Sequence, residues 1–258
     1  MKQSTRALAA VAIAVLTVLP AVSYADDVFS FNVGAVSDYR YRGISQSRLK
    51  PALQGGIDVA LPQGFYVGTW ASTIKWIKDT GTIGGFNAGN ADAEIDLYGG
   101  YKGEIAKDFG YDVGLLQYWY PNNKLGDAPG GAFKNANTTE IYGALTYGPA
   151  TLKYSHAVSN TFGNPDSKNS NYIDLSANFE APWGLTVTPH VGHQRIEGPY
   201  SGVASYTDYS LTVAKEVVKG LTVSLAAVGT DAEKTWYVSP SNKFLGKSAA
   251  VLGLKYAF

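Results

Sequence analysis

Apolar and polar residues alternate with a period of two along most of the chain. Within 109–120, for example, Tyr111, Val113 and Leu115 share one face of an extended strand, and the residues between them are Asp and Gly. No stretch beyond residue 25 keeps apolar residues at helical spacing, so the pattern predicts an all-β protein. The alternating runs lie near 28–42, 51–61, 65–76, 92–103, 109–120, 138–147, 151–161, 170–180, 185–196, 205–216, 221–230 and 247–258.

The links between these runs alternate in length. Short turns, such as 62–64 and 148–149, are followed by longer links rich in Gly, Asn, Asp and Pro, such as 77–91 and 121–137. An even number of strands of about ten residues, with short turns at one end and long loops at the other, is typical of bacterial membrane barrels. We therefore predict a transmembrane antiparallel β-barrel of about twelve strands, with both termini on the side of the short periplasmic turns and with longer extracellular loops.

The spacing of aromatic residues indicates which way the apolar face points. A soluble β-sandwich would bury that face, whereas a membrane barrel exposes it to lipid. If 28–42 is one strand, Phe29 and Phe31 share a face with Tyr39 and Tyr41. Ten residues of tilted strand rise about 25 Å, the height of the lipid-facing band between two aromatic girdles. Further aromatic residues fall at the short-turn end of their strands, namely Tyr101, Tyr147, Phe179, Tyr256 and Phe258.

The first 25 residues have the features of a secretory signal peptide. Lys2 and Arg6 precede an apolar stretch over 7–18, and Ser23-Tyr24-Ala25 forms a small-x-small motif that is typical of the residues just before a cleavage site. An apolar stretch of about 12 residues is too short to cross a membrane as a helix. We expect cleavage after Ala25, and a single barrel domain over 26–258.

The last strand ends on an aromatic residue. Counting back in twos from Phe258 gives Tyr256, Leu254 and Leu252, a large apolar face opposite small or charged residues. This ending resembles the closing strand of outer-membrane barrels. The resemblance implies that Tyr256 and Phe258 form an assembly signal. It also implies that the barrel-assembly machinery and periplasmic chaperones are partners during biogenesis, and that the finished barrel lies among bilayer lipid and lipopolysaccharide in a Gram-negative outer membrane.

Composition excludes several classes of protein. The chain has 21 Lys and Arg against 21 Asp and Glu, without a basic block, so no nucleic-acid partner is expected. Cysteine is absent, which excludes a disulfide framework. His190 and His193 are three residues apart, and on a strand they face opposite sides, so they cannot chelate one ion together. We expect neither a metal nor a cofactor.

The same alternation assigns an inner wall to the barrel. If Tyr39 and Tyr41 face lipid, Arg40 and Arg42 point inward near the outer mouth. Fixed charges in a narrow lumen set the ion preference of a channel, because a low-dielectric wall focuses their field. These charges could instead pair across the lumen and close it. The residues predicted to line the lumen are Arg40, Arg42, Glu94, Asp96, Tyr98, Glu140, Lys153, Asp174, Asp208 and Lys255.

Residues 37–47, with the sequence SDYRYRGISQS, resemble the hallmark of the TorF-type porin family of Gram-negative bacteria. Similar segments follow at 51–56, 64–70, 94–101 and 220–223, so the resemblance covers nearly all of the mature chain. It implies an outer-membrane channel for the passive passage of small hydrophilic solutes or ions. The basic pair Arg48 and Lys50 departs from the acidic residues that are common there in the family.

Two other functions stay open at this point. A barrel that does not conduct could act through its outer loops or as a structural part of the membrane. An outer-membrane lipid acyl hydrolase would need a His that activates a Ser on the same lipid-facing surface. His156 shares its face with Tyr154, but Ser159 is three residues further on and falls on the opposite face. The chain also lacks the glycine-rich and nucleophile motifs of common enzyme classes. We therefore predict that it is not an enzyme.

Overall fold

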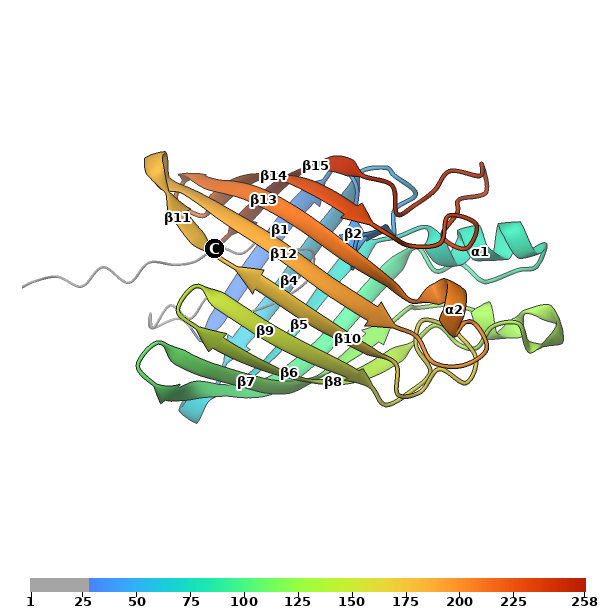
Figure 1. Ribbon diagram of the computed structural model, residues 1–258, viewed down its shortest axis with the longest axis horizontal. Coiled ribbons are helices and arrows are strands. Elements are labelled where there is room, and N and C mark those ends of the chain that lie inside the picture. Colours follow the sequence, from blue (N-terminus) through green and yellow to red (C-terminus); the bar gives the residue numbers. More distant parts are fainter. Residues whose placement is uncertain (1–27) are drawn as a thin grey trace, which may run out of the picture.

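The computed structural model describes residues 28–258, which form a closed antiparallel barrel (Figure 1). Neighbours in sequence are neighbours in the wall, β1 pairs with β15, and β10 pairs with β12, so no edge is left open. β10 and β11 form one interrupted wall strand, which confirms the predicted all-β barrel of twelve strands. The wall consists of β1 Phe29–Val36, β4 Ala52–Ala60, β5 Phe65–Thr73, β6 Ala93–Ala106, β7 Phe109–Trp119, β8 Thr138–Tyr147, β9 Ala150–Ala157, β10 Asn171–Ala177 with β11 Phe179–Ala181, β12 Leu185–Arg195, β13 Tyr206–Val218, β14 Leu221–Thr230 and β15 Ala249–Ala257.

The predicted signal peptide and its cleavage site lie outside the described residues. The predicted runs 138–147 and 221–230 match β8 and β14 to the residue, and most other wall strands begin and end within a few residues of the predicted limits. The closed sheet also excludes a two-sheet sandwich, because every wall strand belongs to one ring of pairings.

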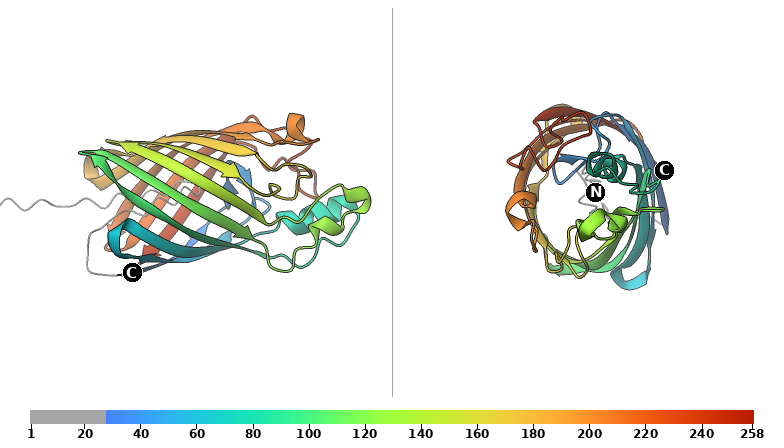
Figure 2. Two further views of the ribbon diagram at one scale, coloured as in Figure 1. Left: turned by 90° about the horizontal axis from the view of Figure 1, so that it is seen from below. Right: turned by 90° about the vertical axis from the view of Figure 1, so that its right-hand side faces the viewer.

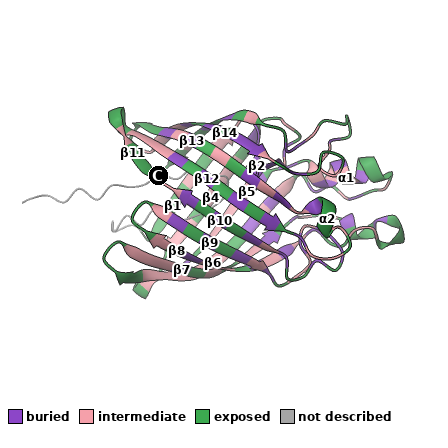
Figure 3. Cartoon of the chain, viewed as in Figure 1, coloured by how far each residue is buried: buried purple, intermediate pink, exposed green. Residues whose placement is uncertain are grey.

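Buried and exposed residues alternate along the wall strands (Figure 3). The large apolar residues of these strands are the exposed ones, so the apolar face points outward. In β7, Val113 and Leu115 are exposed on the outside, whereas Asp112 and Tyr118 are buried on the inside. The same alternation of exposed apolar and buried polar residues recurs around the ring. A soluble protein would not leave so large a continuous apolar surface exposed, but a wall in contact with lipid requires it.

An aromatic girdle surrounds the short-turn end of the barrel. Phe258 packs its ring 5.8 Å from that of Phe31 and 5.6 Å from that of Tyr256. Farther around the wall, the rings of Phe109 and Tyr147 are 6.2 Å apart. The five aromatic residues predicted at this end all lie near the short-turn ends of their strands, on the outward-facing side. In membrane barrels, aromatic residues of this kind lie at the boundary between the apolar band and the lipid headgroups.

The prediction that 28–42 is one strand was wrong. β1 ends at Val36, and the chain then forms β2 Arg40–Tyr41, which pairs with β3 Ile44–Ser45 in a separate two-stranded sheet. Tyr39 and Tyr41 are only 3% and 8% exposed, so they do not face lipid. Where the chain has left the wall, the Asp38 carboxylate accepts hydrogen bonds from Ser45 and Arg40, at 2.5 and 2.6 Å, which hold the two strands of this small sheet together.

The long loops contain short helices that the sequence pattern did not reveal. These are α1 Trp76–Gly84 and α2 Ser201–Ala204, with 3-10 turns η2 Leu125–Asp127 and η3 Pro129–Gly131. Two further 3-10 turns, η1 Pro62–Gly64 and η4 Pro182–Gly184, lie at the short-turn end. Within residues 28–258 no helix has the length and apolar character needed to span a membrane. Seen along the barrel axis, α1 lies inside the outline of the wall, over the long-loop mouth (Figure 2, right).

Candidate functional site

The segment between β1 and β4 folds into the long-loop mouth of the barrel. We call residues 37–50 the inner hairpin. Every residue from Asp38 to Ser45 is buried. Its tight turn uses left-handed backbone at Arg42, with φ of 45°, and at Gly43, with φ of 78°. A Cβ atom at Gly43 would lie 2.4 Å from Cγ2 of Thr230 and 2.7 Å from Cβ of Asp208. The turn is therefore pressed against the inner face of β13 and β14.

This contact predicts that Gly43→Ala destabilises the barrel. The substitution adds left-handed strain and a steric overlap with the wall, which together should lower the free energy of unfolding by about 2–3 kcal/mol. Gly148→Ala is the matched control, since Gly148 also has a positive φ, of 54°, but has no atom within 4 Å of the added Cβ. Urea unfolding of the two variants in the same lipid measures the difference. Equal losses would contradict the close contact at Gly43.

Arg40 fastens the inner hairpin to the segment that precedes β15. Its Nε donates to Asp38 at 2.6 Å, and Nη1 donates to the carbonyl oxygens of Gly43 and Leu245, both at 2.9 Å. The same nitrogen donates to the carbonyl of Lys247 at 3.1 Å. Arg40 is buried, but it lies in the hairpin and not in the wall, and most of its donors are occupied by its own hairpin and by the backbone before β15. Its position supports a clamping role for the hairpin.

Arg42 reaches across the lumen to the opposite wall. Its Nη2 donates to Glu140 of β8 at 2.7 Å, and its Nη1 donates to the side-chain oxygen of Gln194 of β12. The guanidinium carbon also lies 4.2 Å from the centre of the Tyr172 ring of β10. We call Arg42, Glu140, Gln194 and Tyr172 the lumen clamp. The side chains of Arg42 and Glu140 are 6% and 2% exposed, so the pair is removed from water and each charge depends on the other.

Aromatic and acidic side chains surround the lumen clamp. The hydroxyl groups of Tyr41 and Tyr118 are 2.6 Å apart, and Tyr118 donates to Glu140 at 3.2 Å. Tyr39 donates to Glu94 at 2.5 Å. Asp96 is 1% exposed, and neither of its carboxylate oxygens has a hydrogen-bond partner within residues 28–258. Because all of these side chains are buried, they fill the interior at the long-loop end.

A second polar cluster joins β10, β12 and β13. The Nε2 atom of His190 contacts the carboxylate of Asp174, and its Nδ1 lies 3.6 Å from the carboxylate of Asp208. The Tyr172 hydroxyl donates to Asp208 at 2.9 Å, which links this cluster to the lumen clamp. Sequence reasoning named the two aspartates but missed His190. Asp174 and Asp208 were predicted because they occupy inward-facing positions of the alternation. His190 also occupies such a position, so the same criterion would have identified it.

His193, three residues after His190, is exposed on the outer surface, so the prediction that the two histidines face opposite sides is confirmed. No group of three or more His, Cys, Asp or Glu side chains within residues 28–258 is arranged to hold a metal ion.

The remaining predicted lumen residues lie in the middle of the wall and toward the short-turn end. Tyr98 donates to Asp58 at 2.5 Å, and both are half-buried, as is Lys255. Lys153 is buried, with its Nζ 4.2 Å from the centre of the Tyr142 ring. The lumen is therefore filled at its long-loop end, whereas several inward side chains toward the short-turn end keep contact with water.

Ion pairs outside the wall brace the loops over the mouth. Arg48 of the inner hairpin donates to both carboxylate oxygens of Asp79 in α1, and this contact raises the pKa of Arg48. Lys75 donates to Asp92 at 2.7 Å, and Lys78 donates to the other oxygen of the same carboxylate. These two hydrogen bonds lower the pKa of Asp92, so the carboxylate stays ionised to lower pH than usual. Arg48 is thus neutralised by Asp79 and adds little positive charge to the mouth.

The geometry at His156 differs from that of a hydrolase. The Ser159 hydroxyl donates to the carbonyl of Asn160 at 3.0 Å and accepts from the backbone N–H of Thr139 at 2.8 Å. The Nδ1 atom of His156 instead lies 3.4 Å from the Tyr154 hydroxyl. A nucleophilic Ser requires a hydrogen bond to its base, and these contacts direct the two side chains to other partners.

Comparisons with known proteins agree with the barrel geometry. A family model described as "bacterial protein of unknown function (Gcw_chp)" matches residues 21–258. Among solved structures, the NanC porin has 10% sequence identity and a TM-score of 0.53, with 89% of this chain and 98% of that chain covered. A KdgM porin in complex with disordered oligogalacturonate has 7% identity and a TM-score of 0.51, with the same coverage. At such identities the likeness shows the fold alone. A search of curated proteins finds no match.

Proposed function

The chain belongs to this Gcw_chp family of bacterial proteins, and from its porin-like barrel we propose that it is an outer-membrane channel for the passive passage of small hydrophilic solutes or ions. The short-turn end would face the periplasm and the long loops the cell exterior, as in bacterial barrels generally. The resemblance of residues 37–47 to the TorF-type porins supports this assignment, as do the apolar outer face and the aromatic girdle. The signal peptide would direct export and would then be cleaved.

One observation carries the proposal: charged and polar side chains face the interior from one end of the barrel to the other. They include Glu94 near the long-loop end, Lys153 and Asp174 in the middle, and Asp58 and Lys255 toward the short-turn end. Ionisable groups inside a membrane are costly, and they generally mark a path for solutes or ions. A barrel that served only as a structural element could fill its interior with apolar residues at lower cost.

The lumen clamp would hold this channel in a closed state. Because its side chains and those of the inner hairpin fill the long-loop end, passage requires that Arg42 and the hairpin shift away from the axis. The channel would therefore open in discrete events of small conductance. Purified, refolded protein in a planar lipid bilayer tests the proposal. Stepwise conductance supports it, whereas a silent bilayer containing barrel that is folded, as shown by heat-modifiable migration, contradicts it.

The filled interior also supports a second candidate, a barrel that does not conduct and acts through its outer loops. The observation in its favour is the near-complete burial of Asp38 to Ser45 together with Glu94, Asp96 and Glu140. In this second candidate, these contacts hold the inner hairpin in the lumen as a permanent plug. The two candidates differ in the response to weakening the lumen clamp, because a permanent plug stays silent when only one of its contacts is lost.

The orientation of the barrel gives a separate prediction. An epitope tag inserted within 121–137, in the long loop after β7, should bind antibody on intact cells. A tag in the two-residue turn at 107–108, between β6 and β7, should bind antibody only after the outer membrane is permeabilised. The two sites follow the opposite ends of the same strand, β7, so they form a matched pair. The reverse labelling would invert the assigned topology.

A further inference from the structure

The apolar side chains of the long loops pack in two separate clusters over the mouth. One cluster contains Leu125, and Phe133 packs against it. The other contains Ile44 and Leu245, and Tyr237 packs against it. A cavity of about 370 Å³ lies between the two clusters and takes its lining from both. The loops over the mouth therefore form two packed halves that meet across an unfilled space.

The loop after β7 and the loop after β14 leave the wall at opposite points of the ring. Between the pair β7 and β8 and the pair β14 and β15 lie β6, β5, β4 and β1 on one side, and β9, β10, β12 and β13 on the other. We call residues 120–137 the β7–β8 loop. We call residues 231–248, together with residues 196–205 after β12, the opposing loops. A contact between the β7–β8 loop and residues 231–248 spans the mouth.

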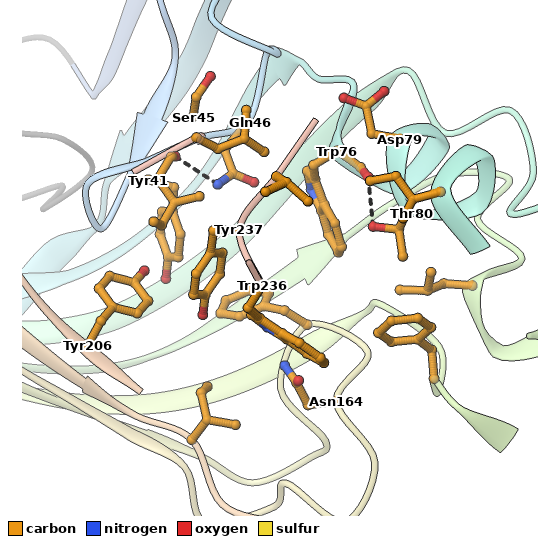
Figure 4. Close-up of a pocket in the computed structure, with 18 of the residues that line it drawn as sticks. Tyr41, Ser45, Gln46, Trp76, Asp79, Thr80, Asn164, Tyr206, Trp236 and Tyr237 are labelled. Carbon is orange, nitrogen blue, oxygen red and sulfur yellow. Dashed lines mark hydrogen bonds between the residues drawn. The ribbon is translucent and has the colours of Figure 1, made fainter. Parts of the chain in front are cut away.

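Three aromatic rings make such a contact. The ring centre of Phe133, in the β7–β8 loop, lies 6.3 Å from that of Tyr200 and 6.4 Å from that of Trp236, both in the opposing loops. The ring centres of Tyr200 and Trp236 are 4.7 Å apart. All three side chains are half-buried, and Trp236 borders the cavity together with Trp76 and Tyr237 (Figure 4). We call Phe133, Tyr200 and Trp236 the aromatic latch.

Neighbouring loops, in contrast, are joined by hydrogen bonds around the rim of the mouth. The N–H of Lys134 in the β7–β8 loop donates to the carbonyl of Gly163 at 2.7 Å. Within the opposing loops, the Tyr237 hydroxyl donates to the carbonyl of Ala204 at 2.6 Å. Within residues 28–258, no hydrogen bond or ion pair joins the β7–β8 loop to the opposing loops. The contact across the mouth is therefore apolar, whereas the contacts around the rim are polar.

We propose that the aromatic latch is a releasable lid, and that the β7–β8 loop parts from the opposing loops along the cavity to admit molecules to the inner hairpin. Each ring pair contributes little to stability, so the latch can open at small cost. A mouth held by hydrogen bonds would instead leave polar groups unpaired when it opened. The lumen clamp closes the lumen, and the latch closes the way to the hairpin above it. The proposal does not depend on conduction.

The reporter for the test is Ile44→Cys, since Ile44 lines the cavity and is only 4% exposed. The full-length mature barrel in lipid nanodiscs is treated with a membrane-impermeant maleimide, and the labelling rate is followed by mass. The rate at a covered thiol reports how often its cover opens. Thr82→Cys, at an exposed position of α1, gives the rate without a cover. We expect the thiol at position 44 to label completely, but much more slowly than the thiol at 82.

Phe133→Ala removes both ring contacts across the mouth. It should raise the labelling rate at position 44 about tenfold and leave the rate at 82 unchanged. Trp236→Ala removes one of the two contacts and should raise the rate at 44 about threefold. The double variant should label at the rate of Phe133→Ala alone, because both substitutions act through the same contact. Phe86→Ala is the control, since Phe86 packs against one cluster only, and it should leave the rate unchanged.

Trp236→Ala decides the test if Phe133→Ala fails to give heat-modifiable barrel, and Ile196→Cys, also in the lining and 2% exposed, replaces a reporter that fails to fold. Equal rates at 44 and 82 in the barrel with an intact latch would overturn the proposal. So would unchanged rates in the folded latch variants, an equal increase in Phe86→Ala, or effects that multiply in the double variant. The predicted rates in a barrel that is silent in planar bilayers would support the latch while the channel proposal fails.

Discussion

Replacing Arg42 with Ala should raise the conductance of the reconstituted barrel several-fold and increase its preference for cations. The guanidinium occupies the lumen between the inner hairpin and three strands of the opposite wall, so its removal clears space on the axis. It also takes one positive charge from a lumen whose carboxylates Glu94, Asp96 and Glu140 remain. Single-channel recording gives the conductance, and the reversal potential in a salt gradient gives the ion preference.

The same substitution should destabilise the barrel, since it leaves Glu140 buried without its counter-charge. Loss of one partner of a buried pair costs about 3–5 kcal/mol. The double variant Arg42→Ala with Glu140→Ala should recover part of this stability while conductance stays high. Arg195→Ala is the control, because Arg195 pairs with Glu197 at 2.9 Å on the surface and its side chain is 62% exposed. Unchanged conductance and selectivity in folded Arg42→Ala would rule out the lumen clamp as the barrier to flow.

Deleting Phe258 should leave the precursor exported but strongly reduce the amount of folded barrel in the outer membrane. Phe258 lies at the seam where the first and last wall strands meet. Its N–H donates to the carbonyl of Phe31 at 3.0 Å, and its carbonyl accepts from the N–H of Phe31 at 2.9 Å. Its exposed ring extends the outward aromatic face of β15, which the assembly machinery reads in the barrels that this ending resembles. The measured quantity is the heat-modifiable fraction in isolated outer membranes.

Two controls separate assembly from stability. Phe258→Tyr keeps the backbone contacts and an aromatic ring, so it should insert normally. Trp183→Ala removes another aromatic side chain at the short-turn end, one that is 82% exposed, and should also insert normally. The purified deletion variant should still refold in detergent, because the rest of the seam between β1 and β15 is intact. Wild-type levels of inserted barrel from the deletion would refute an assembly role for Phe258.

The wall of the barrel could be predicted from the sequence because lipid and lumen impose opposite demands on successive residues. That constraint is local, so each strand carries its own signal, as β8 and β14 show. The prediction of the wall failed at residues 37–42, where the alternation continues although the chain has left the wall. Both conformations are extended and alternate in the same way. The feature that distinguishes the hairpin from a wall strand is the left-handed turn at Arg42 and Gly43. In the sequence, a single Gly is the only indication of this turn.

The lumen site could be predicted only in part. Arg42 lies inside the barrel, as expected, but the supporting premise that Tyr39 and Tyr41 face lipid was wrong. Its partners Glu140 and Gln194 are 98 and 152 residues away in the sequence. Pairing across a lumen depends on ring closure, strand stagger and the path of the hairpin, none of which is encoded in a local pattern. The cavity above the clamp was missed for the same reason, since loops distant in sequence supply its lining.

The most direct test of the account is the chemical accessibility of single cysteines along the lumen. The protein contains no cysteine, so each introduced thiol is unique. Asn32→Cys places a thiol at a half-buried inward position of β1, and Ser155→Cys places one at an inward position of β9 that is 4% exposed. A membrane-impermeant maleimide is applied to barrels in nanodiscs, where both mouths meet the reagent.

We predict that the thiol at position 32 reacts, that the thiol at 155 does not, and that adding Arg42→Ala makes position 155 reactive. Fast labelling of position 155 in the otherwise unaltered barrel would show that the lumen clamp does not close the lumen. Failure to label either position, with or without Arg42, would show that the interior is dry and would contradict the account as a whole.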